Sequence, residues 1–385
     1  MTRMLRRLFD ALASFQLAIV VLAFLFLLTI IGTLEQTHSS LYEVQRRYFE
    51  SAFVIHRVAG IPLPLPGVSL LLVVLAVNLV CGGMVRIRKA STTVGVILGH
   101  IGILVMLAGS AIESYASQKG HTTLPEGESA SEFVSYFDWE IAVTEQKGVG
   151  RLTELVIPGE KFMHLAPGEL ATFTAPELPF ELVVHNVYAN CEPRAAVNAT
   201  SLAVDGFALV QMPREKEAES ETAGAYVTVR PTGGGEPQQG ILWSGERFPM
   251  SVIVAERRFT IDFSHRRWRL PFAVHLDDFR QELHPGMGMA KSFESDVTKV
   301  ENGVPQKIKI SMNEPLREEG YTLFQSGFIE PDKGGGGRWW STFSVVRNPA
   351  DSVPLWSCII IAAGLLLHFS QKLIRHVRAE SRRRP

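Results

Sequence analysis

Four long apolar stretches constrain this sequence more than any other feature. They cover residues 15–33, 67–84, 93–113 and 353–369. At about 1.5 Å of rise per residue, helices of this length cross the roughly 30 Å hydrocarbon layer of a bilayer. The sequence therefore predicts a polytopic membrane protein with four transmembrane α-helices. The long segment between the third and fourth stretches is large enough to form a domain with its own core.

Basic residues flank the apolar stretches in a pattern that indicates their orientation. Three clusters are present, namely Arg3, Arg6 and Arg7; Arg86, Arg88 and Lys89; and Lys372, Arg375, Arg378 and Arg382 to Arg384. The positive-inside rule places all three clusters, and hence both termini, in the cytoplasm. The net charge of −1 then reflects topology and gives no indication of nucleic-acid binding. No small-residue cleavage site follows the first stretch, so we expect a retained helix rather than a signal peptide.

This topology divides the chain into three parts. Residues 1–113 should hold three transmembrane helices and an outer loop, 34–66, and residues 353–385 the fourth helix with its basic cytoplasmic tail. In the loop, apolar residues at spacings of three and four predict an amphipathic helix: Leu41, Val44, Tyr48, Ala52 and Ile55. Arg46, Arg47 and His56 on this helix fit either a solvated face or contacts with anionic groups, such as haem propionates or lipid phosphates.

Residues 114–352 are typical of β-structure. Segments such as FELVVHNVYA, AYVTVRP and YTLFQSGF are rich in β-branched and aromatic residues, and glycine-rich or acidic breaks separate them. Helical periodicity is nearly absent. We therefore expect a large, mostly antiparallel, sandwich-like β domain on the extracytoplasmic side.

The chain has three scattered cysteines, Cys81, Cys191 and Cys358, and neither a CxxC nor a CxxCH motif. It therefore lacks the motifs for thioredoxin-like redox chemistry and for a covalently attached c-type haem. A bridge between Cys191 and Cys358, and any redox role for them, remain open.

Two histidines lie inside apolar stretches. His100 is in the third, about 10–12 Å from its cytoplasmic end by helical rise, and His368 is near the cytoplasmic end of the fourth. Ionisable groups inside a spanning helix are costly, and a neutral imidazole is a good ligand for haem iron. The alternatives are a hydrogen bond to a neighbouring helix for His100 and an interfacial position for His368. If both are ligands, the two can share one iron.

Several motifs resemble those of the ResB family of cytochrome c biogenesis proteins, the System II synthetase subunits. They are IGTLEQ after the first stretch, the histidine of the third, LDDFRQELHPGMGMAKSFESDVTKV, NEPLREEGYTLFQSGF, and STFSVVRNPADSVPLW followed by GLLLHF. The resemblance covers the four-span layout and is strongest at residues 275–370. The chain departs from the family in its shorter outer domain, and WWS at Trp339 to Ser341 is not the WWD motif of the partner proteins.

The resemblance implies a subunit that helps to carry haem across the bacterial inner membrane and presents it with apocytochrome c for thioether attachment. It implies a tryptophan-rich membrane partner of the ResC/CcsA type, surrounding membrane lipids, and a transiently bound b-type haem. It assigns His100 as an axial iron ligand; His368 is a second cofactor-binding candidate from its position alone. We assign no catalytic residue to this chain, and expect a non-catalytic or co-catalytic subunit of a haem lyase.

Two other functions fit the same residues. One is a non-catalytic membrane scaffold or chaperone for a haem-protein assembly partner, which the absence of WWD and CxxCH motifs favours. The other is an electron-transfer protein that holds a membrane haem between His100 and His368. The six histidines of the β region show no metal-ligand spacing, and we expect surface or satisfied core positions for them: His121, His164, His185, His265, His275 and His284.

Overall fold

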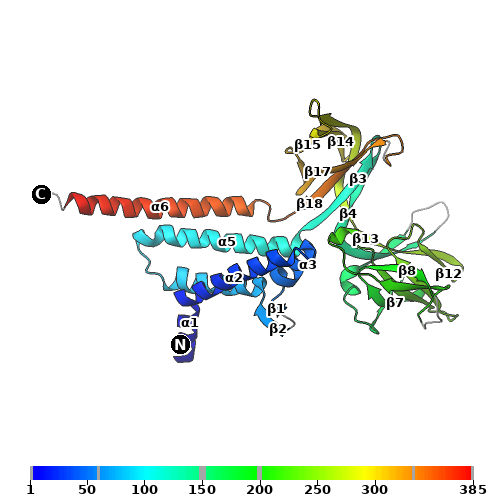
Figure 1. The fold of residues 1–385 in the computed structure, drawn as a ribbon, viewed down its shortest axis with the longest axis horizontal. Coiled ribbons are helices and arrows are strands. Elements are labelled where there is room, and N and C mark those ends of the chain that lie inside the picture. The colour runs from blue at the N-terminus through cyan, green and yellow to red at the C-terminus, as the bar shows by residue number, and fades with distance from the viewer. Residues whose placement is uncertain (1–2, 59–60, 147–152, 197–201, 332–333, 383–385) are drawn as a thin grey trace. The chain divides into compact units, whose positions relative to one another are not determined.

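The computed structural model describes residues 3–58, 61–146, 153–196, 202–331 and 334–382 (Figure 1). Arg383 and Arg384 of the expected basic tail lie outside these described residues. The chain forms two units: residues 1–117 with 348–385, called the helical unit below, and residues 118–347, called the β unit. These unit boundaries differ by a few residues from the domain boundaries expected from the sequence, which followed residues 113 and 352. The reason is that helix α5 continues to Ala116 and strand β18 ends at Arg347.

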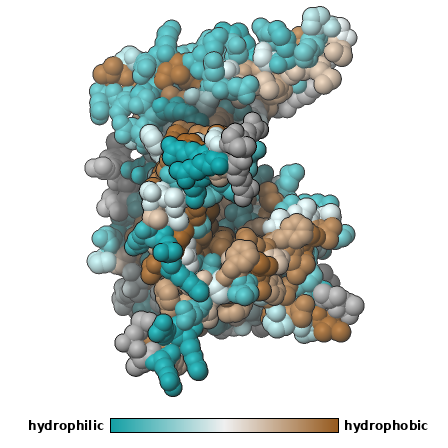
Figure 2. Space-filling view, turned by 90° about the vertical axis from the view of Figure 1, so that its left-hand side faces the viewer, coloured by the Kyte–Doolittle hydropathy of each residue, from teal (hydrophilic) through white to brown (hydrophobic). Residues whose placement is uncertain are grey.

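The helical unit contains the expected spans. Its helices are α1 (Arg3–Leu12), α2 (Phe15–Glu35), α3 (Leu41–Val44), η1 (Gln45–Glu50), α4 (Val68–Asn78), η2 (Leu79–Arg86), η3 (Ser91–Thr93), α5 (Val94–Ala116) and α6 (Val353–Ser381). Among the described residues, four helical segments can cross a membrane: α2, α4 with η2, η3 with α5, and α6. No more than 22 % of any span's apolar window is buried, so most of that surface is left for lipid. Figure 2 shows apolar side chains exposed on one face of the molecule.

A buried asparagine in α4 forms hydrogen bonds with the backbone at the break between α1 and α2. Asn78, at the end of α4, donates from Nδ2 to the carbonyl oxygens of Leu12, over 2.7 Å, and Ser14, over 2.9 Å. These carbonyls lie where α1 ends and α2 begins, and the Ser14 hydroxyl accepts from the Leu17 amide to cap α2. The polar side chain of this span therefore compensates for a break in the neighbouring helix.

The outer loop differs from its prediction. The helical pattern ends at Glu50, and a hairpin follows, formed by β1 (Phe53–Val58) and β2 (Ile61–Pro66). The expected amphipathic helix over Leu41 to Ile55 is therefore wrong in its second half. Prolines at alternate positions of β2 suit an edge strand, because their missing N–H groups can face away from β1. The loop and hairpin share a core with α2 and α4: Val21, Leu28, Val44, Tyr48, Val54, Leu65, Val68 and Leu71.

The β unit is antiparallel, as expected. Its strands are β3 (Gln118–Pro125), β4 (Ser129–Glu145), β5 (Thr153–Pro158), β6 (Leu170–Phe173), β7 (Phe180–Tyr188), β8 (Cys191–Ala195), β9 (Phe207–Gln211), β10 (Gly224–Pro231), β11 (Gln238–Trp243), β12 (Met250–Val254), β13 (Arg257–Leu283), β14 (Ala290–Glu301), β15 (Val304–Ser311), β16 (Leu316–Glu318), β17 (Tyr321–Ile329) and β18 (Trp340–Arg347). Two short 3₁₀ turns, η4 (Gly159–Lys161) and η5 (Ala218–Ser220), are the helical elements in its described part.

Two large hydrophobic cores and a small one, formed by Cys191, Leu209 and Tyr226, stabilise the β unit. The first lies between the four-stranded sheet β11-β10-β7-β6 and strands β4, β5, β12 and β13 of the ten-stranded sheet, which is a sandwich arrangement. The second is formed by the rest of the ten-stranded sheet, from β3 and β13 through β18. Strands β4 and β13 contribute to both cores. The predicted fold class, four membrane helices with a large antiparallel β domain, is confirmed.

Candidate functional site

His100 lies in α5 beside the π-helical end of the second span. Its Nδ1 donates to the carbonyl oxygen of Gly83 over 3.2 Å. A carbonyl can only accept, so Nδ1 carries the proton and Nε2 of the neutral ring keeps its lone pair. The last carbonyls of a helix have no partner within it, and π-helical segments occur often at functional sites. The end of η2 therefore both exposes an acceptor and fixes the tautomer of His100.

Glycines determine which way His100 points. Gly95, Gly102 and Gly109 are the buried residues of α5, spaced by seven, and they pack against α6. His100 is five residues beyond Gly95, which turns it by about 140° around the helix axis, towards the second span. Gly83 leaves the room that the ring needs, because a Cβ atom there would lie 2.8 Å from Cε1 of His100.

His368 lies in α6 at a different contact. Its backbone N–H is 2.7 Å from the position that a Cβ atom would take on Gly95. Its ring meets Phe369 edge-on, at 5.5 Å between ring centroids, and its Nδ1 is buried without a hydrogen-bond partner among the described residues. His368 therefore approaches the α6-facing side of α5, whereas His100 is on the side facing η2. The two imidazoles therefore lie on different sides of helix α5.

The residues around His100 fit haem iron on one side of the porphyrin. Histidine ligands commonly donate the other ring N–H to a carbonyl, which orients the ring and raises its basicity. His100 already makes this bond with Gly83. Among the described residues, no group of three His, Cys, Asp or Glu side chains can hold a free metal ion. The arrangement thus suits a metal that brings its own equatorial ligands.

Two histidines of the β unit, His121 and His265, form fewer hydrogen bonds among the described residues than the sequence led us to expect. His121, in β3, stacks on Tyr136 at 5.2 Å, and His265, in β13, stacks on Trp139 at 3.8 Å. In the described part of the chain, Nδ1 of each is buried without a partner. Both lie beside a bulge where the pairing of β4 with β13 shifts, between His265 and Arg267. Burial is the main cause that lowers the pKa of each imidazole, so both favour the neutral form.

This burial predicts that the β unit loses stability in mild acid. The folded-state pKa values of His121, His185 and His265 lie below the ordinary 6.5. The unfolded chain then binds more protons as the pH falls below 6.5, at about 1.4 kcal/mol per pKa unit of difference. We expect constant stability above pH 6.5 and a decline towards pH 5.5, measured as thermal unfolding by tryptophan fluorescence of the full chain in detergent.

The decisive measurement is the slope of the unfolding temperature against pH. His265→Gln should flatten it even if the variant is less stable at neutral pH. His275→Gln is the matched control, because that ring is partly exposed and hydrogen-bonds Ser129 over 2.9 Å. Equal unfolding temperatures of the native chain at pH 7.5 and pH 5.5 would contradict the prediction.

The tryptophans of the WWS segment pack within the β unit. Trp339 lies 5.4 Å from Phe279 and 6.0 Å from Phe328, measured between ring centroids. Trp340 donates from Nε1 to the carbonyl oxygen of Gly335 over 2.8 Å. Both side chains therefore have structural partners in the fold.

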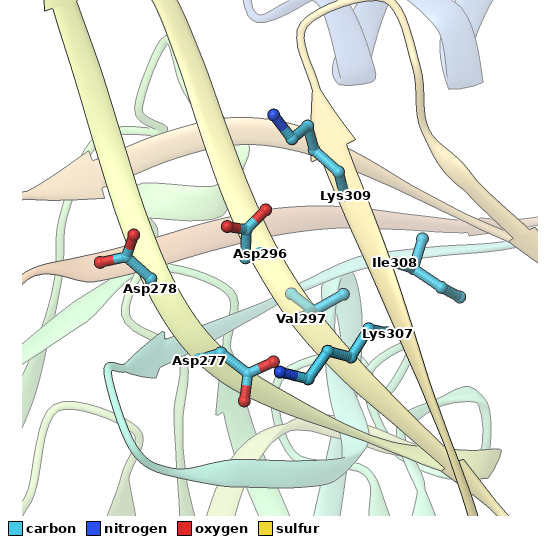
Figure 3. A pocket seen from close by; sticks show the side chains of 7 residues that line it. All are labelled: Asp277, Asp278, Asp296, Val297, Lys307, Ile308 and Lys309. Atoms are coloured by element: carbon cyan, nitrogen blue, oxygen red, sulfur yellow. The ribbon is translucent and has the colours of Figure 1, made fainter.

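Figure 3 shows a shallow, charged depression on β13, β14 and β15. It has a volume of about 480 Å³ and is lined by Asp277, Asp278, Asp296, Val297, Lys307, Ile308 and Lys309. Most of its charges are paired: Arg280 donates to Asp278 of the same strand over 2.7 Å and to Asp296 of β14 over 2.6 Å, and Lys309 of β15 donates to Glu294 of β14 over 2.8 Å. Such pairs hold strand register and leave little charge for a ligand.

The cysteines offer no disulfide and no reactive thiol in the β unit. All three are free. Cys191 is fully buried, and burial raises the pKa of its thiol to about 12.

The fold and the buried histidines define a membrane protein of four spans that carries an antiparallel β unit. Residues 238–335, from β11 to the loop after β17, match the family model of the ResB-like family. This match confirms the resemblance to the ResB family found in the motifs of the chain. No curated protein matches the chain.

Proposed function

We propose that this chain is the ResB-type subunit of a cytochrome c synthetase. In this role it binds haem within the membrane, helps to carry it to the outer side, and presents it together with apocytochrome c. The ResB-like match associates the chain with cytochrome c biogenesis. The haem ligand, the partner and the direction of transport are parts of the proposal.

The observation that carries the proposal is the state of His100. Its ring is inside a spanning helix, tied through Nδ1 to Gly83, and has a free lone pair on Nε2. A histidine that only joins two helices would also form this hydrogen bond, so the bond alone does not separate the two roles. In a ResB-like chain, however, the same bond prepares the ring for an axial role.

The second axial ligand is assigned to a partner. His368 is on the other side of α5 from His100, so this geometry does not favour a bis-histidine haem held by these two residues. We propose a tryptophan-rich ResC/CcsA-type protein as that partner. The orientation with both termini in the cytoplasm follows the three basic clusters.

The β unit is proposed to position the client. Thioether formation needs reduced haem and two thiols on apocytochrome c held close together, so much of the task is proximity. The buried Cys191 is unsuited to thiol exchange, which leaves both reacting thiols to the client. The paired charges of the described sheet surfaces fit a rigid support better than a catalytic centre.

The test is complementation combined with spectroscopy. The native chain is expressed with its partner in cells that lack both proteins, the complex is purified, and its reduced visible spectrum is recorded alongside the cellular level of holocytochrome c. We expect a low-spin haem spectrum in the complex and restored holocytochrome c. Restored holocytochrome c without haem in the complex would favour the scaffold function. Failure to restore it, with both proteins present in the membrane, would contradict the proposal.

A further inference from the structure

The short helix α1 is exposed along its whole length. None of its ten residues, Arg3 to Leu12, is buried. Its large apolar side chains include Met4, Leu5 and Leu8, which are 83 %, 54 % and 57 % exposed. Single exposed apolar residues are common on proteins, but a contiguous group of them marks a surface that another molecule covers. The apolar residues of α1 therefore indicate an apolar environment supplied from outside the chain.

The charged and apolar side chains of α1 lie on opposite faces. At 3.6 residues per turn, the charged residues occupy one arc of about 100° around the helix axis, and the apolar residues occupy the rest. The charged residues are Arg3, Arg6, Arg7 and Asp10, and the apolar residues are Met4, Leu5, Leu8, Phe9, Ala11 and Leu12. Three arginines against one aspartate leave the charged face with two net positive charges, and all three arginines are exposed. The helix is thus amphipathic, with a basic polar face.

The length and direction of α1 suit a position in the plane of the membrane. Its ten residues rise by about 15 Å, half of the roughly 30 Å hydrocarbon layer, so the helix cannot span it. Amphipathic helices with arginine or lysine on the polar face lie at the boundary between headgroups and acyl chains. Figure 1 shows α1 running across the direction of α2, the first span. When α2 crosses the bilayer, α1 therefore lies along its surface.

The backbone between α1 and α2 is held against the second span. Asn78 donates to the carbonyl oxygens of Leu12 and Ser14. The Ala13 backbone packs on Gly82, where a Cβ atom would lie 3.0 Å from the Ala13 carbonyl oxygen. Both contacts are at the end of the second span that the positive-inside rule places at the cytoplasmic surface. The direction of α1 is therefore fixed at the level of the lipid headgroups.

The charge on α1 selects the kind of lipid. Anionic phospholipids attract basic segments near the membrane surface, and the guanidinium group matches the geometry of a phosphate. The lipid-facing surface of the first span begins close by, since Phe15, the first residue of α2, is 78 % exposed. A bilayer that surrounds α2 thus reaches the apolar face of α1 without a gap. A protein partner would cover the apolar face but would leave the basic face unexplained.

We infer that α1 is an interfacial helix that binds anionic phospholipids of the cytoplasmic leaflet. Its arginine face binds the headgroup phosphates, and its apolar face lies among the upper parts of the acyl chains. Asn78 joins this anchor to the membrane helices. The inference does not depend on haem binding, so it and the proposed function can fail separately.

The first test measures the depth of each face of α1 in the full chain. Nitroxide labels are placed by Leu8→Cys on the apolar face and by Asp10→Cys on the charged face. The accessible thiols are removed by Cys81→Ser and Cys358→Ser, whereas Cys191 is fully buried and remains. In nanodiscs of phosphatidylcholine mixed with phosphatidylglycerol, we expect the Leu8→Cys label to collide with oxygen and the Asp10→Cys label with a water-soluble nickel complex. Equal access of the nickel complex to both labels would overturn the inference.

The second test removes the charge while keeping the Leu8→Cys label. The ratio of lipid-embedded to water-exposed label, taken from the two components of the paramagnetic resonance spectrum, should fall by about fivefold for each of Arg3, Arg6 and Arg7 changed to Gln. The matched control changes the same three residues to Lys, which keeps the charge and should keep the ratio near the native value. Pure phosphatidylcholine nanodiscs and high salt should each lower the native ratio, because the attraction is electrostatic. The same ratio in both lipid compositions and in both triple variants would refute the binding of anionic lipid.

A label at the centre of α2 shows that the spans remain inserted. Phe26 is 70 % exposed in the first span, so a label introduced by Phe26→Cys should stay in lipid in every variant. Gel filtration and circular dichroism exclude misfolding. If the Leu8→Cys label is in water in nanodiscs of either composition and becomes shielded only when a partner protein is added, the apolar face of α1 belongs to that partner and the inference is overturned.

Discussion

His100→Ala is expected to reduce the haem content of the purified complex at least tenfold and to abolish holocytochrome c assembly. The substitution removes the axial nitrogen and leaves the Gly83 carbonyl without its donor. Loss of even an outer-shell partner of a ligand typically costs 10–100-fold in metal affinity, and loss of the ligand itself should cost more. The measurement is haem per complex from the reduced pyridine spectrum, with holocytochrome c counted in the same cells.

Two companion variants make this result specific. His376→Ala removes an exposed histidine of α6, which pairs with Glu380 over 3.4 Å, and should leave haem content unchanged. Gly83→Ala places a methyl group against the His100 ring and should lower haem content while the ligand is still present. Added imidazole should partly restore haem binding to His100→Ala. Unchanged haem content in His100→Ala would refute the ligand assignment.

The sequence predicted the features that depend on one-dimensional patterns. The four spans were located to within a few residues, except that α6 continues to Ser381, and the β-rich composition of the long insert indicated an antiparallel domain. Both depend on length, hydropathy and residue type, which are local properties. The ResB-like match at 238–335 contains two of the motifs on which the resemblance was based, LDDFRQELHPGMGMAKSFESDVTKV and NEPLREEGYTLFQSGF.

What the sequence missed depends on contacts between distant residues. The loop helix gave way to a hairpin after Glu50, since the alternate prolines of β2 and the core with α2 outweigh the helical spacing of Ile55. The hydrogen bond of His100 required a π-helical end in the preceding span, which no periodicity shows. His121 and His265 are 144 positions apart in sequence, counted from 121 to 265, and only the strand pairing brings each against its aromatic partner.

Gly364→Leu is expected to separate α5 from α6 and destabilise the helical unit by about 3 kcal/mol, at the upper end of the cost of overpacking. A Cβ atom at Gly364 would lie 2.7 Å from the carbonyl oxygen of Gly95 and 2.7 Å from the amide nitrogen of Gly99. Both contacts are backbone atoms, so no side chain can move aside to relieve them. The measurement is unfolding of the full chain in mixed micelles, followed by circular dichroism as denaturing detergent is added.

Ala362→Leu provides the matched control for this prediction, because Ala362 is on an exposed side of the same helix and the added side chain would face lipid. Small residues let transmembrane helices approach closely, and their effect comes from contact geometry rather than from hydrophobicity. If the glycine contacts set the distance between α5 and α6, Gly364→Leu should unfold at a lower detergent fraction than the native chain, and Ala362→Leu should not. Equal transitions for all three proteins would mean that the two helices are held together elsewhere, and that the orientation of His100 does not depend on the glycine contacts of α5.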